Sequence, residues 1–234
     1  MWRYSPDYGP DTKDLNAIPL DVRESLMSED FMWDATKHLP NFKDVSISYW
    51  QESLALSRKL TKIIGLSLGL PESYFDKYVT YPGADGGYNH SPPLTVEEAA
   101  QKRDISMGSH RDVQFLTLVW QDHIGRLQAL KPDGQWITVT PISDTIIVNI
   151  GDFLMRLSND RYISTVHKVS DAALKERFSL TFFFGLNFNE KIEVLKTCIP
   201  EGEMAKYEPI SAGEVRNEPY CYTFGRATNL MSSL

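Results

Sequence analysis

The stretch "GSHRDVQFLTLVWQD", residues 108–122, places a histidine and an aspartate two positions apart, immediately before an apolar run. The run 115–121 combines valine, leucine and aromatic residues, a composition typical of a buried β-strand. In an extended chain, residues i and i+2 share a face, so His110 and Asp112 point the same way and Arg111 turns to the other side. The stretch therefore predicts a core strand preceded by two side chains that could bind a metal.

Short β-type runs separated by turn residues continue on both sides of this stretch. The polar residues 84–104 interrupt them, and we expect a surface loop there with a short helix beginning at Thr95. A hairpin turn is expected at "KPDGQW". Many strands spaced about 8–12 residues apart favour a sandwich or barrel. The predicted strands are 78–82, 105–110, 115–121, 126–130, 135–139, 145–150, 162–169 and 177–185.

The N-terminal third has helical periodicity instead. Between residues 41 and 70, apolar residues recur three or four positions apart, which predicts a long helix lying on the core and ending before Pro71. A second, weaker helix is predicted at 22–37. The expected fold is mainly β with flanking helices, in one domain over residues 1–234. The apolar stripe of the long helix is Phe42, Val45, Tyr49, Leu56, Leu60, Ile63 and Ile64.

Composition excludes several classes of function. The 234 residues carry 24 Lys and Arg against 31 Asp and Glu, a formal net charge of −7, which argues against nucleic acid or an anionic membrane as the main partner. Cys198 and Cys221 are too few for a disulfide scaffold, and no Cys-x-x-Cys pair suggests zinc. The polar N-terminus and the lack of a long apolar run predict no targeting peptide and no membrane segment. We therefore expect a cytoplasmic protein.

A second histidine turns the pair at 110 and 112 into a candidate metal site. By itself, His-x-Asp is more often a strand-end histidine bonded to a neighbouring acid. His167, however, lies in "RYISTVHKV", among β-branched residues where an imidazole has no packing role. Two imidazoles and one carboxylate are the donor set suited to non-haem Fe(II), with three positions left open. His110, Asp112 and His167 are the predicted ligands.

Arg177 and Ser179 form another i, i+2 pair on one strand face, ten residues after His167. Taken alone, Arg177 would lie at a rim and bridge Glu176 or Asp171. A guanidinium and a hydroxyl pointing into an apolar barrel are costly to bury unless an anion pairs with them. Beside the metal ligands, they predict a socket for a dicarboxylate whose other end chelates the metal.

The order H-x-D, H, R-x-S resembles the Fe(II)/2-oxoglutarate-dependent dioxygenases of the isopenicillin N synthase-like branch. Residues 109–130, 148–169 and 175–185 look like core segments of that branch, and residues 54–75 look like its long central helix. The resemblance covers residues 40 to 215. It implies a double-stranded β-helix, a jelly roll with helices packed on one side. The domain would then comprise a helical flank (1–77), a jelly-roll core (78–190) and a C-terminal extension (191–234).

The resemblance also implies roles for individual residues. The predicted triad would bind Fe(II), and Arg177 and Ser179 would hold the distal carboxylate of 2-oxoglutarate. Tyr81, which precedes Pro82, matches a family tyrosine that touches the same co-substrate. Phe183 matches an aromatic residue of the substrate pocket and falls on the face of Arg177 by strand counting. Simple core packing is the alternative for Phe183.

The chain departs from the family pattern in four places. Val79 stands where relatives often have asparagine, and Arg126 replaces the second glycine of a usual pair. The 84–104 segment is longer than usual and is expected to border the mouth of the site. Relatives begin earlier, so the N-terminus is shortened. We expect residues 1–20 to lie ordered against the barrel near that mouth, and the protein to be a homodimer or larger, because exposed strand edges and apolar patches favour association.

The resemblance implies oxidation of a C–H bond of a small organic substrate, a specialised metabolite, with O2 and 2-oxoglutarate consumed. Hydroxylation, desaturation and ring formation are all compatible with the residues. One alternative is an Fe(II) oxidase of the same fold that draws its electrons from the substrate, with Arg177 and Ser179 holding the substrate's carboxylate. Another is a non-catalytic binding protein, which the intact triad disfavours.

Overall fold

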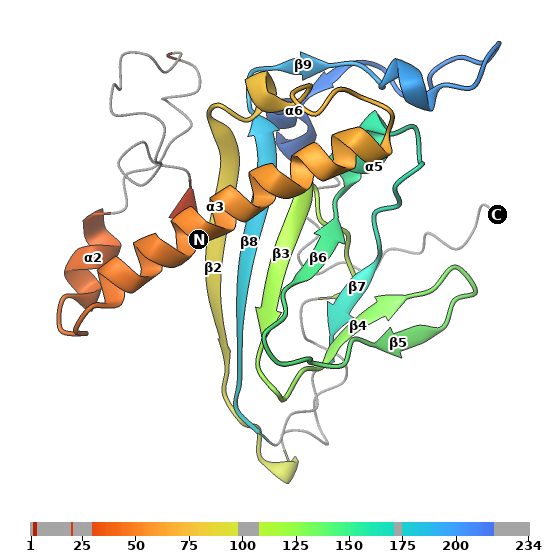
Figure 1. Ribbon diagram of the computed structural model, residues 1–234. Coiled ribbons are helices and arrows are strands. Elements are labelled where there is room, and N and C mark those ends of the chain that lie inside the picture. Colours follow the sequence, from red (N-terminus) through yellow and green to blue (C-terminus); the bar gives the residue numbers. More distant parts are fainter. Residues whose placement is uncertain (1, 4–19, 21–29, 98–107, 171–174, 218–234) are drawn as a thin grey trace.

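Antiparallel sheets and one long helix make up the part of the chain that the computed structural model describes, residues 2–3, 20, 30–97, 108–170 and 175–217 (Figure 1). The helices are α2 (Asp30–Thr36), α3 (Phe42–Ser67), α5 (Asp152–Leu157) and α6 (Ala212–Asn217), with 3-10 turns η2 (Asp76–Tyr78) and η3 (Lys196–Cys198). The strands are β1 (Trp2–Arg3), β2 (Pro82–Ser91), β3 (Leu116–Gln121), β4 (Leu127–Leu130), β5 (Trp136–Thr138), β6 (Ile147–Ile150), β7 (His167–Val169), β8 (Arg177–Asn187), β9 (Lys191–Ile192) and β10 (Ile210–Ser211).

Two of the sheets build the core. The larger has the strand order β1-β2-β8-β3-β6, and the smaller has the order β5-β4-β7. An isolated bridge between His110 and His167 joins the segment before β3 to β7. The long helix α3 lies across one face of the larger sheet (Figure 1). This arrangement confirms the prediction of a mainly β fold with flanking helices.

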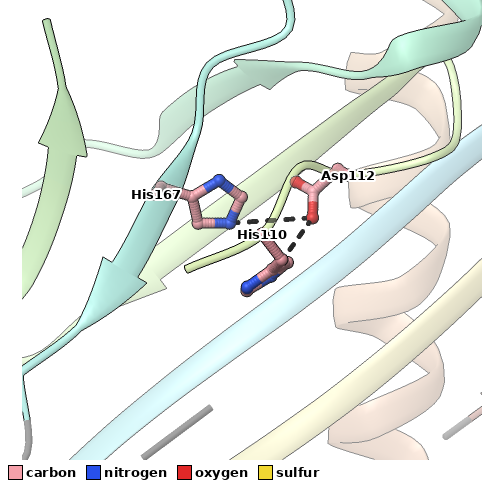
Figure 2. Close-up of side chains that lie close together, drawn as sticks. All are labelled: His110, Asp112 and His167. Atoms are coloured by element: carbon pink, nitrogen blue, oxygen red, sulfur yellow. Dashed lines mark ion pairs between the residues drawn. The ribbon is translucent and has the colours of Figure 1, made fainter. Parts of the chain in front are cut away.

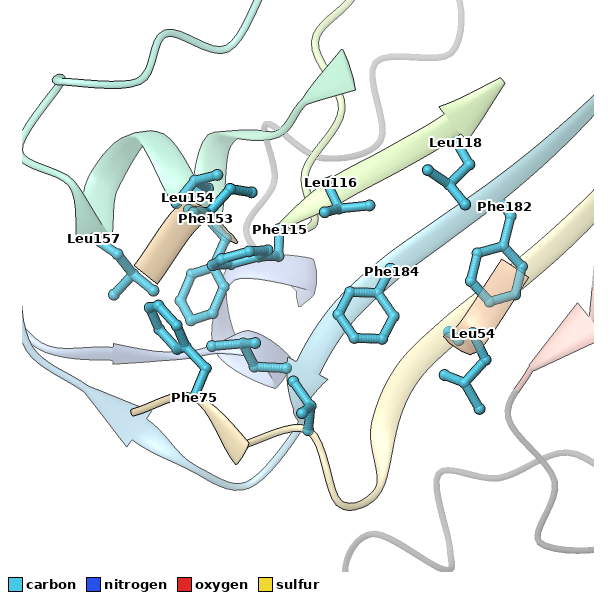
Figure 3. Packing of buried hydrophobic residues seen from close by; sticks show 14 of the residues in the cluster. Leu54, Phe75, Phe115, Leu116, Leu118, Phe153, Leu154, Leu157, Phe182 and Phe184 are labelled. Carbon is cyan, nitrogen blue, oxygen red and sulfur yellow. The ribbon is translucent and has the colours of Figure 1, made fainter. Parts of the chain in front are cut away.

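Strand β8 divides its side chains between the two faces of the larger sheet. Phe182 and Phe184 are fully buried on the face that α3 covers (Figure 3), and Leu186, two residues further along the strand, is fully buried as well. The ring of Trp50 on α3 meets that of Phe182 edge to face, with centroids 5.6 Å apart. Each such buried side chain contributes about 1.5–3 kcal/mol. The alternate residues, beginning with Arg177, point to the other face, between the two sheets.

The predicted long helix is confirmed, but only part of the predicted stripe faces the core: Ile64 is buried and Phe42, Leu56 and Leu60 pack against the core. Val45 and Ile63 of the predicted stripe are 65% and 54% exposed. The buried side is rich in small residues, which let the helix approach the sheet closely and leave room for the ring of Trp50. That side consists of Ser46, Trp50, Ser53, Leu54, Ser57, Thr61, Ile64 and Gly65.

The segment 84–104 contains a strand where a surface loop was predicted. Residues 82–91 form β2, which pairs along its length with β8 from Pro82↔Asn187 to Ser91↔Arg177. The predicted strand 78–82 is not formed: the 3-10 turn η2 ends at Tyr78, residues 79–81 are bends, and β2 begins at Pro82. The sequence "GADGGYNH" has poor intrinsic β propensity, but pairing along the whole length of β8 stabilises the strand. At Gly87 a Cβ would lie 3.0 Å from Thr181 Oγ1, so a larger residue would require Thr181 to shift slightly.

The remaining predicted elements differ in how far they are confirmed. β3, β4, β5, β6 and β8 match predicted strands within a few residues, whereas the strand predicted at 162–169 is reduced to β7. Residues 22–29 and 105–107 lie outside the described residues. The helix predicted to begin at Thr95 can be followed only as far as residue 97 for the same reason. α2 forms the end of the weaker predicted helix.

The start of the chain touches the edge of the larger sheet. Trp2 pairs with Gly86 and Arg3 with Asp85, so that β1 covers part of the edge of β2. Residues 4–19 lie outside the described residues, and the expectation that 1–20 are ordered near the mouth of the site stays a prediction for them. Within the described ranges, no helix is long and apolar enough to cross a bilayer.

Candidate metal centre

The three predicted metal ligands converge on one point between the sheets. One nitrogen from each of His110 and His167 and one oxygen of Asp112 all lie within 4.8 Å of one another. The Nε2 atoms of His110 and His167 are 3.8 Å and 3.7 Å from the same oxygen, Asp112 Oδ1 (Figure 2). These separations suit atoms that share one cation, since ligand–metal distances are about 2.0–2.2 Å. The donor set and its convergence therefore fit a divalent transition metal.

Backbone pairing brings the ligands together. His110 N donates to His167 O at 3.0 Å and His167 N donates to His110 O at 2.9 Å, so the two histidines face each other across an antiparallel bridge. The imidazole centroids lie 4.4 Å apart. Asp112, two residues on, falls on the same side as His110. The His-x-Asp spacing thus works as the sequence predicts, although only one bridge and no long strand carries it.

Hydrogen bonds fix which atoms remain available to a metal. The Nδ1 atoms of His110 and His167 lie 3.0 Å from the carbonyls of Gly108 and Thr165, so each Nδ1 carries the proton and each Nε2 presents its lone pair. Burial lowers the pKa of His110, and the neighbouring His167 lowers it further. Both effects favour the neutral imidazole that binds metals.

The carboxylate of Asp112 is held in the same way. Its side chain is 5% exposed, and its Oδ2 accepts hydrogen bonds from Thr117 Oγ1 at 2.7 Å and Asn149 Nδ2 at 2.6 Å. Oδ1 is left to face the two imidazoles. Sequence reasoning missed both donors. The available signal was Asn149, a lone amide in the apolar strand "TIIVNI".

Arg177 and Ser179 lie at the beginning of β8 and form the predicted polar socket. Arg177 is 3% exposed, its Nη1 donates to Ser179 Oγ at 2.8 Å, and its Nε donates to the carbonyl of Gly125. The rim position considered for Arg177 does not hold, since Glu176 pairs with His90 at 2.9 Å; Asp171 lies outside the described residues. An arginine held by a hydroxyl and a carbonyl keeps N–H groups for a carboxylate.

The register of the larger sheet relates the socket to the metal centre. Thr117, which holds Asp112, is directly opposite Phe183, and Ser179 is directly opposite Gln121. Directly opposite residues share a face, so Phe183, Thr181 and Ser179 lead in that order from the level of the triad to the socket. Phe183 is half-buried, and its assignment to a substrate pocket stays a prediction.

Tyr81 is not part of this group. It precedes β2 at the end where Pro82 pairs with Asn187, and its N–H donates to Asn187 Oδ1 at 2.8 Å. Arg177 lies at the opposite end of the 11-residue strand β8, about 30 Å away along the sheet at 3.3 Å per residue. A five-carbon dicarboxylate cannot span that distance. The assignment of Tyr81 to the co-substrate is therefore wrong, and Ser91 is the β2 residue paired with Arg177.

The family model described as the 2OG-Fe(II) oxygenase superfamily matches residues 87–186, which include the triad and the Arg177–Ser179 pair. The part of the chain that carries the candidate site is thus similar to this superfamily. A "2-oxoglutarate-Fe(II) type oxidoreductase ppzC" of Metarhizium rileyi is 40% identical to it over 212 residues, or 88% of this chain and 57% of the relative.

Solved structures of the 2OG-Fe(II) oxygenase superfamily share the fold. A full-length Neurospora crassa protein in complex with alpha-KG superposes with a TM-score of 0.71 at 31% identity, covering 76% of this chain and 56% of that one. JOX2 in complex with 2OG, Fe and JA gives 0.68 at 28% identity, covering 91% and 56%. The core is thus the double-stranded β-helix that the sequence predicted. The chain spans between half and two thirds of the length of these proteins.

Proposed function

We propose that the protein is a non-haem Fe(II)- and 2-oxoglutarate-dependent dioxygenase that oxidises a C–H bond of a small organic substrate. The observation that carries the proposal is the shared geometry of two features, a His-His-Asp triad with free Nε2 and Oδ1 atoms and a buried arginine–serine socket on the same inner face. The names of the relatives support the use of 2-oxoglutarate.

Each residue has a defined role in this proposal. His110, Asp112 and His167 would hold Fe(II), leaving three positions open. With O2 and 2-oxoglutarate, the bound iron supplies a two-electron oxidation of the substrate, and 2-oxoglutarate leaves as succinate and CO2. Arg177 and Ser179 would hold the distal carboxylate of 2-oxoglutarate and so orient its 2-oxo acid end toward the metal. The apolar strands around the triad limit the access of water.

Phe183 would border the substrate pocket. It stands beside Thr117 at the level of Asp112, on the side of the triad away from the socket. A half-buried aromatic side chain there suits an apolar or aromatic substrate. The Neurospora crassa protein has been crystallised with thymine and JOX2 with JA, both small molecules. We propose a small specialised metabolite as the substrate class here.

The direct test is the formation of succinate. The Fe(II)-loaded protein, incubated aerobically with 2-oxoglutarate and a panel of small organic compounds, should release succinate and consume O2 in equal amounts. An Arg177→Ala variant should lose most of this turnover at low 2-oxoglutarate, while its metal content stays normal. Substrate oxidation without succinate would instead indicate an oxidase. Normal metal binding with no binding of 2-oxoglutarate would indicate a binding protein and overturn the proposal.

We further propose that the protein is cytoplasmic and forms a homodimer. The two cysteines, too few for a disulfide scaffold of the secreted type, favour the first. Exposed apolar side chains on α3, Val45, Ile63 and Leu66, favour an interface. Light scattering of the full chain tests the dimer, and a monomer at micromolar concentration would contradict it. Fluorescence microscopy of a tagged chain in its host tests the compartment.

A further inference from the structure

The turn between β3 and β4 contains a backbone conformation that its sequence does not favour. Gly125 and Arg126 are both left-handed, with φ of 69° and 71°. Glycine adopts this conformation freely, whereas an arginine with φ above zero is strained. Strained residues persist where the surrounding structure requires them, and they are often found at functional sites. The presence of arginine at position 126, in place of glycine, therefore needs a structural or functional explanation.

The same turn contacts both parts of the site. The carbonyl of Gly125 accepts the Nε proton of Arg177 and so fixes the guanidinium of the socket. The carbonyl of Arg126 accepts a hydrogen bond from Ser170 N at 3.0 Å, and Arg126 Nη1 donates to Ser170 O at 2.7 Å. Ser170 directly follows β7, the strand that carries the metal ligand His167. The turn thus lies between the socket and the metal-bearing strand.

Arg126 also carries a positive charge whose field reaches Arg177. Burial lowers the pKa of Arg177, and the charge of Arg126 lowers it further. Asp122 opposes this effect only in part, and both of its oxygens accept backbone hydrogen bonds, from Ile124 N and Phe178 N. The positive charges of Arg126 and Arg177 repel each other in an empty site, and a bound anion would offset this repulsion.

We propose that Arg126 is a second cationic determinant of co-substrate binding, which acts through its charge on the distal carboxylate held by Arg177 and Ser179. This inference rests on the proposed function. In this role Arg126 makes the protein bind dianionic 2-oxo acids in preference to monoanionic ones. The strained turn holds the Arg126 guanidinium on the carbonyl of Ser170, and the preceding residue, Gly125, holds Arg177.

Binding measurements on the full-length, Mn(II)-loaded protein test this role without turnover. Titration with 2-oxoglutarate is compared with titration by 2-oxopentanoate, which has the same carbon chain but no distal carboxylate. Arg126→Gln and Arg126→Gly should raise the Kd for 2-oxoglutarate about tenfold and leave that for 2-oxopentanoate unchanged. Arg126→Lys, which keeps the charge, should bind 2-oxoglutarate nearly as tightly as the wild type. The affinity of the wild type should also fall more steeply with salt than that of Arg126→Gln.

Two further measurements separate a charge effect from a structural one. Arg126→Gly relieves the left-handed strain, so its Tm should equal or exceed that of the wild type even as 2-oxoglutarate binding weakens. Arg161→Gln is the matched control, because Arg161 Nη1 likewise donates to a backbone carbonyl, that of Thr197, in the segment after β9. It should leave both Kd values unchanged.

Each result of these titrations either supports or overturns the proposed role of Arg126. If the wild type binds 2-oxoglutarate and the Arg126 variants bind it equally well, this inference is overturned and the proposed function stands. Equal weakening for both 2-oxo acids would assign Arg126 a purely structural role and also overturn it. A wild type that binds metal but not 2-oxoglutarate would overturn the proposed function, and this inference with it.

Discussion

Replacing Thr117 by valine should weaken metal binding although Thr117 is not a ligand. The side chain is 1% exposed, and its hydroxyl donates to Asp112 Oδ2 at 2.7 Å. Valine has nearly the same shape, so the change removes one hydrogen bond and little packing. Asn149 Nδ2 continues to donate to Oδ2 at 2.6 Å, which limits but does not cancel the loss.

The expected magnitude follows from the charge of the acceptor. A hydrogen bond to an ionised group contributes about 1.5–3 kcal/mol, and about 1.4 kcal/mol corresponds to a tenfold change in an equilibrium constant. Loss of a partner behind a metal ligand typically costs about 10- to 100-fold in affinity. Because one of two donors remains, we expect a value near the lower end, about a tenfold rise in the Kd for Mn(II).

Calorimetric titration of the purified protein with Mn(II) measures this Kd. Thr61→Val is the matched control, since Thr61 is equally buried and its hydroxyl donates at 2.8 Å to the neutral carbonyl of Ser57 on α3. It should reduce stability by about 1 kcal/mol and leave the Kd for Mn(II) unchanged. The reasoning fails if Thr117→Val binds Mn(II) as tightly as the wild type, or if both variants weaken binding to the same extent.

Three other expectations concern the ligands, the socket and a remote tyrosine. His110→Ala or His167→Ala should abolish stoichiometric metal binding, measured by metal analysis, while the circular dichroism spectrum stays native; near-normal iron content would refute the triad. Arg177→Lys keeps the charge but loses the two-pronged geometry, so steady-state kinetics should give a 2-oxoglutarate KM about 10- to 100-fold higher with unchanged metal affinity. Burial and the hydrogen bond that Tyr207 donates to Asp160 raise the pKa of Tyr207 to about 12 from 10.0. Its contribution to stability is therefore complete below pH 10 and is lost from pH 10 to 12, and denaturant titrations should show a smaller decrease over that range for Tyr207→Phe.

The metal centre was predictable because its ligands lie in short motifs with a fixed backbone period. His110 and Asp112 need only an extended chain to share a side, and His167 is anomalous among β-branched residues. The residues that hold the metal ligands in place were not predictable in this way. Thr117 and Asn149 meet Asp112 through the register of β3 with β6, which pairs these two residues, and no local pattern encodes that register.

Strand β2 and part of the buried face of α3 were predicted wrongly because tertiary packing overrides local sequence preference. Local propensity disfavours a strand in "GADGGYNH", yet β8 on one side supplies hydrogen-bond partners that override it. Tyr81 was assigned from a Tyr-Pro pair alone, and the pairing of Pro82 with Asn187 puts it at the wrong end of the sheet. On α3, apolar periodicity located the helix, but close approach to the sheet selected its small residues for burial.

The alternation along β8 constrains how this protein can change over evolutionary time. Its odd-numbered residues from Arg177 to Phe183 face the site, and its even-numbered residues Phe182 and Phe184 support α3. Inserting or deleting one residue within the strand would exchange the two sets, placing phenylalanines over the iron ligands and an arginine under the helix. Insertions and deletions inside β8 are therefore not a route to new substrate preferences. New substrate preferences can arise there only by substitution at every second position, and those substitutions leave the helix-packed core untouched.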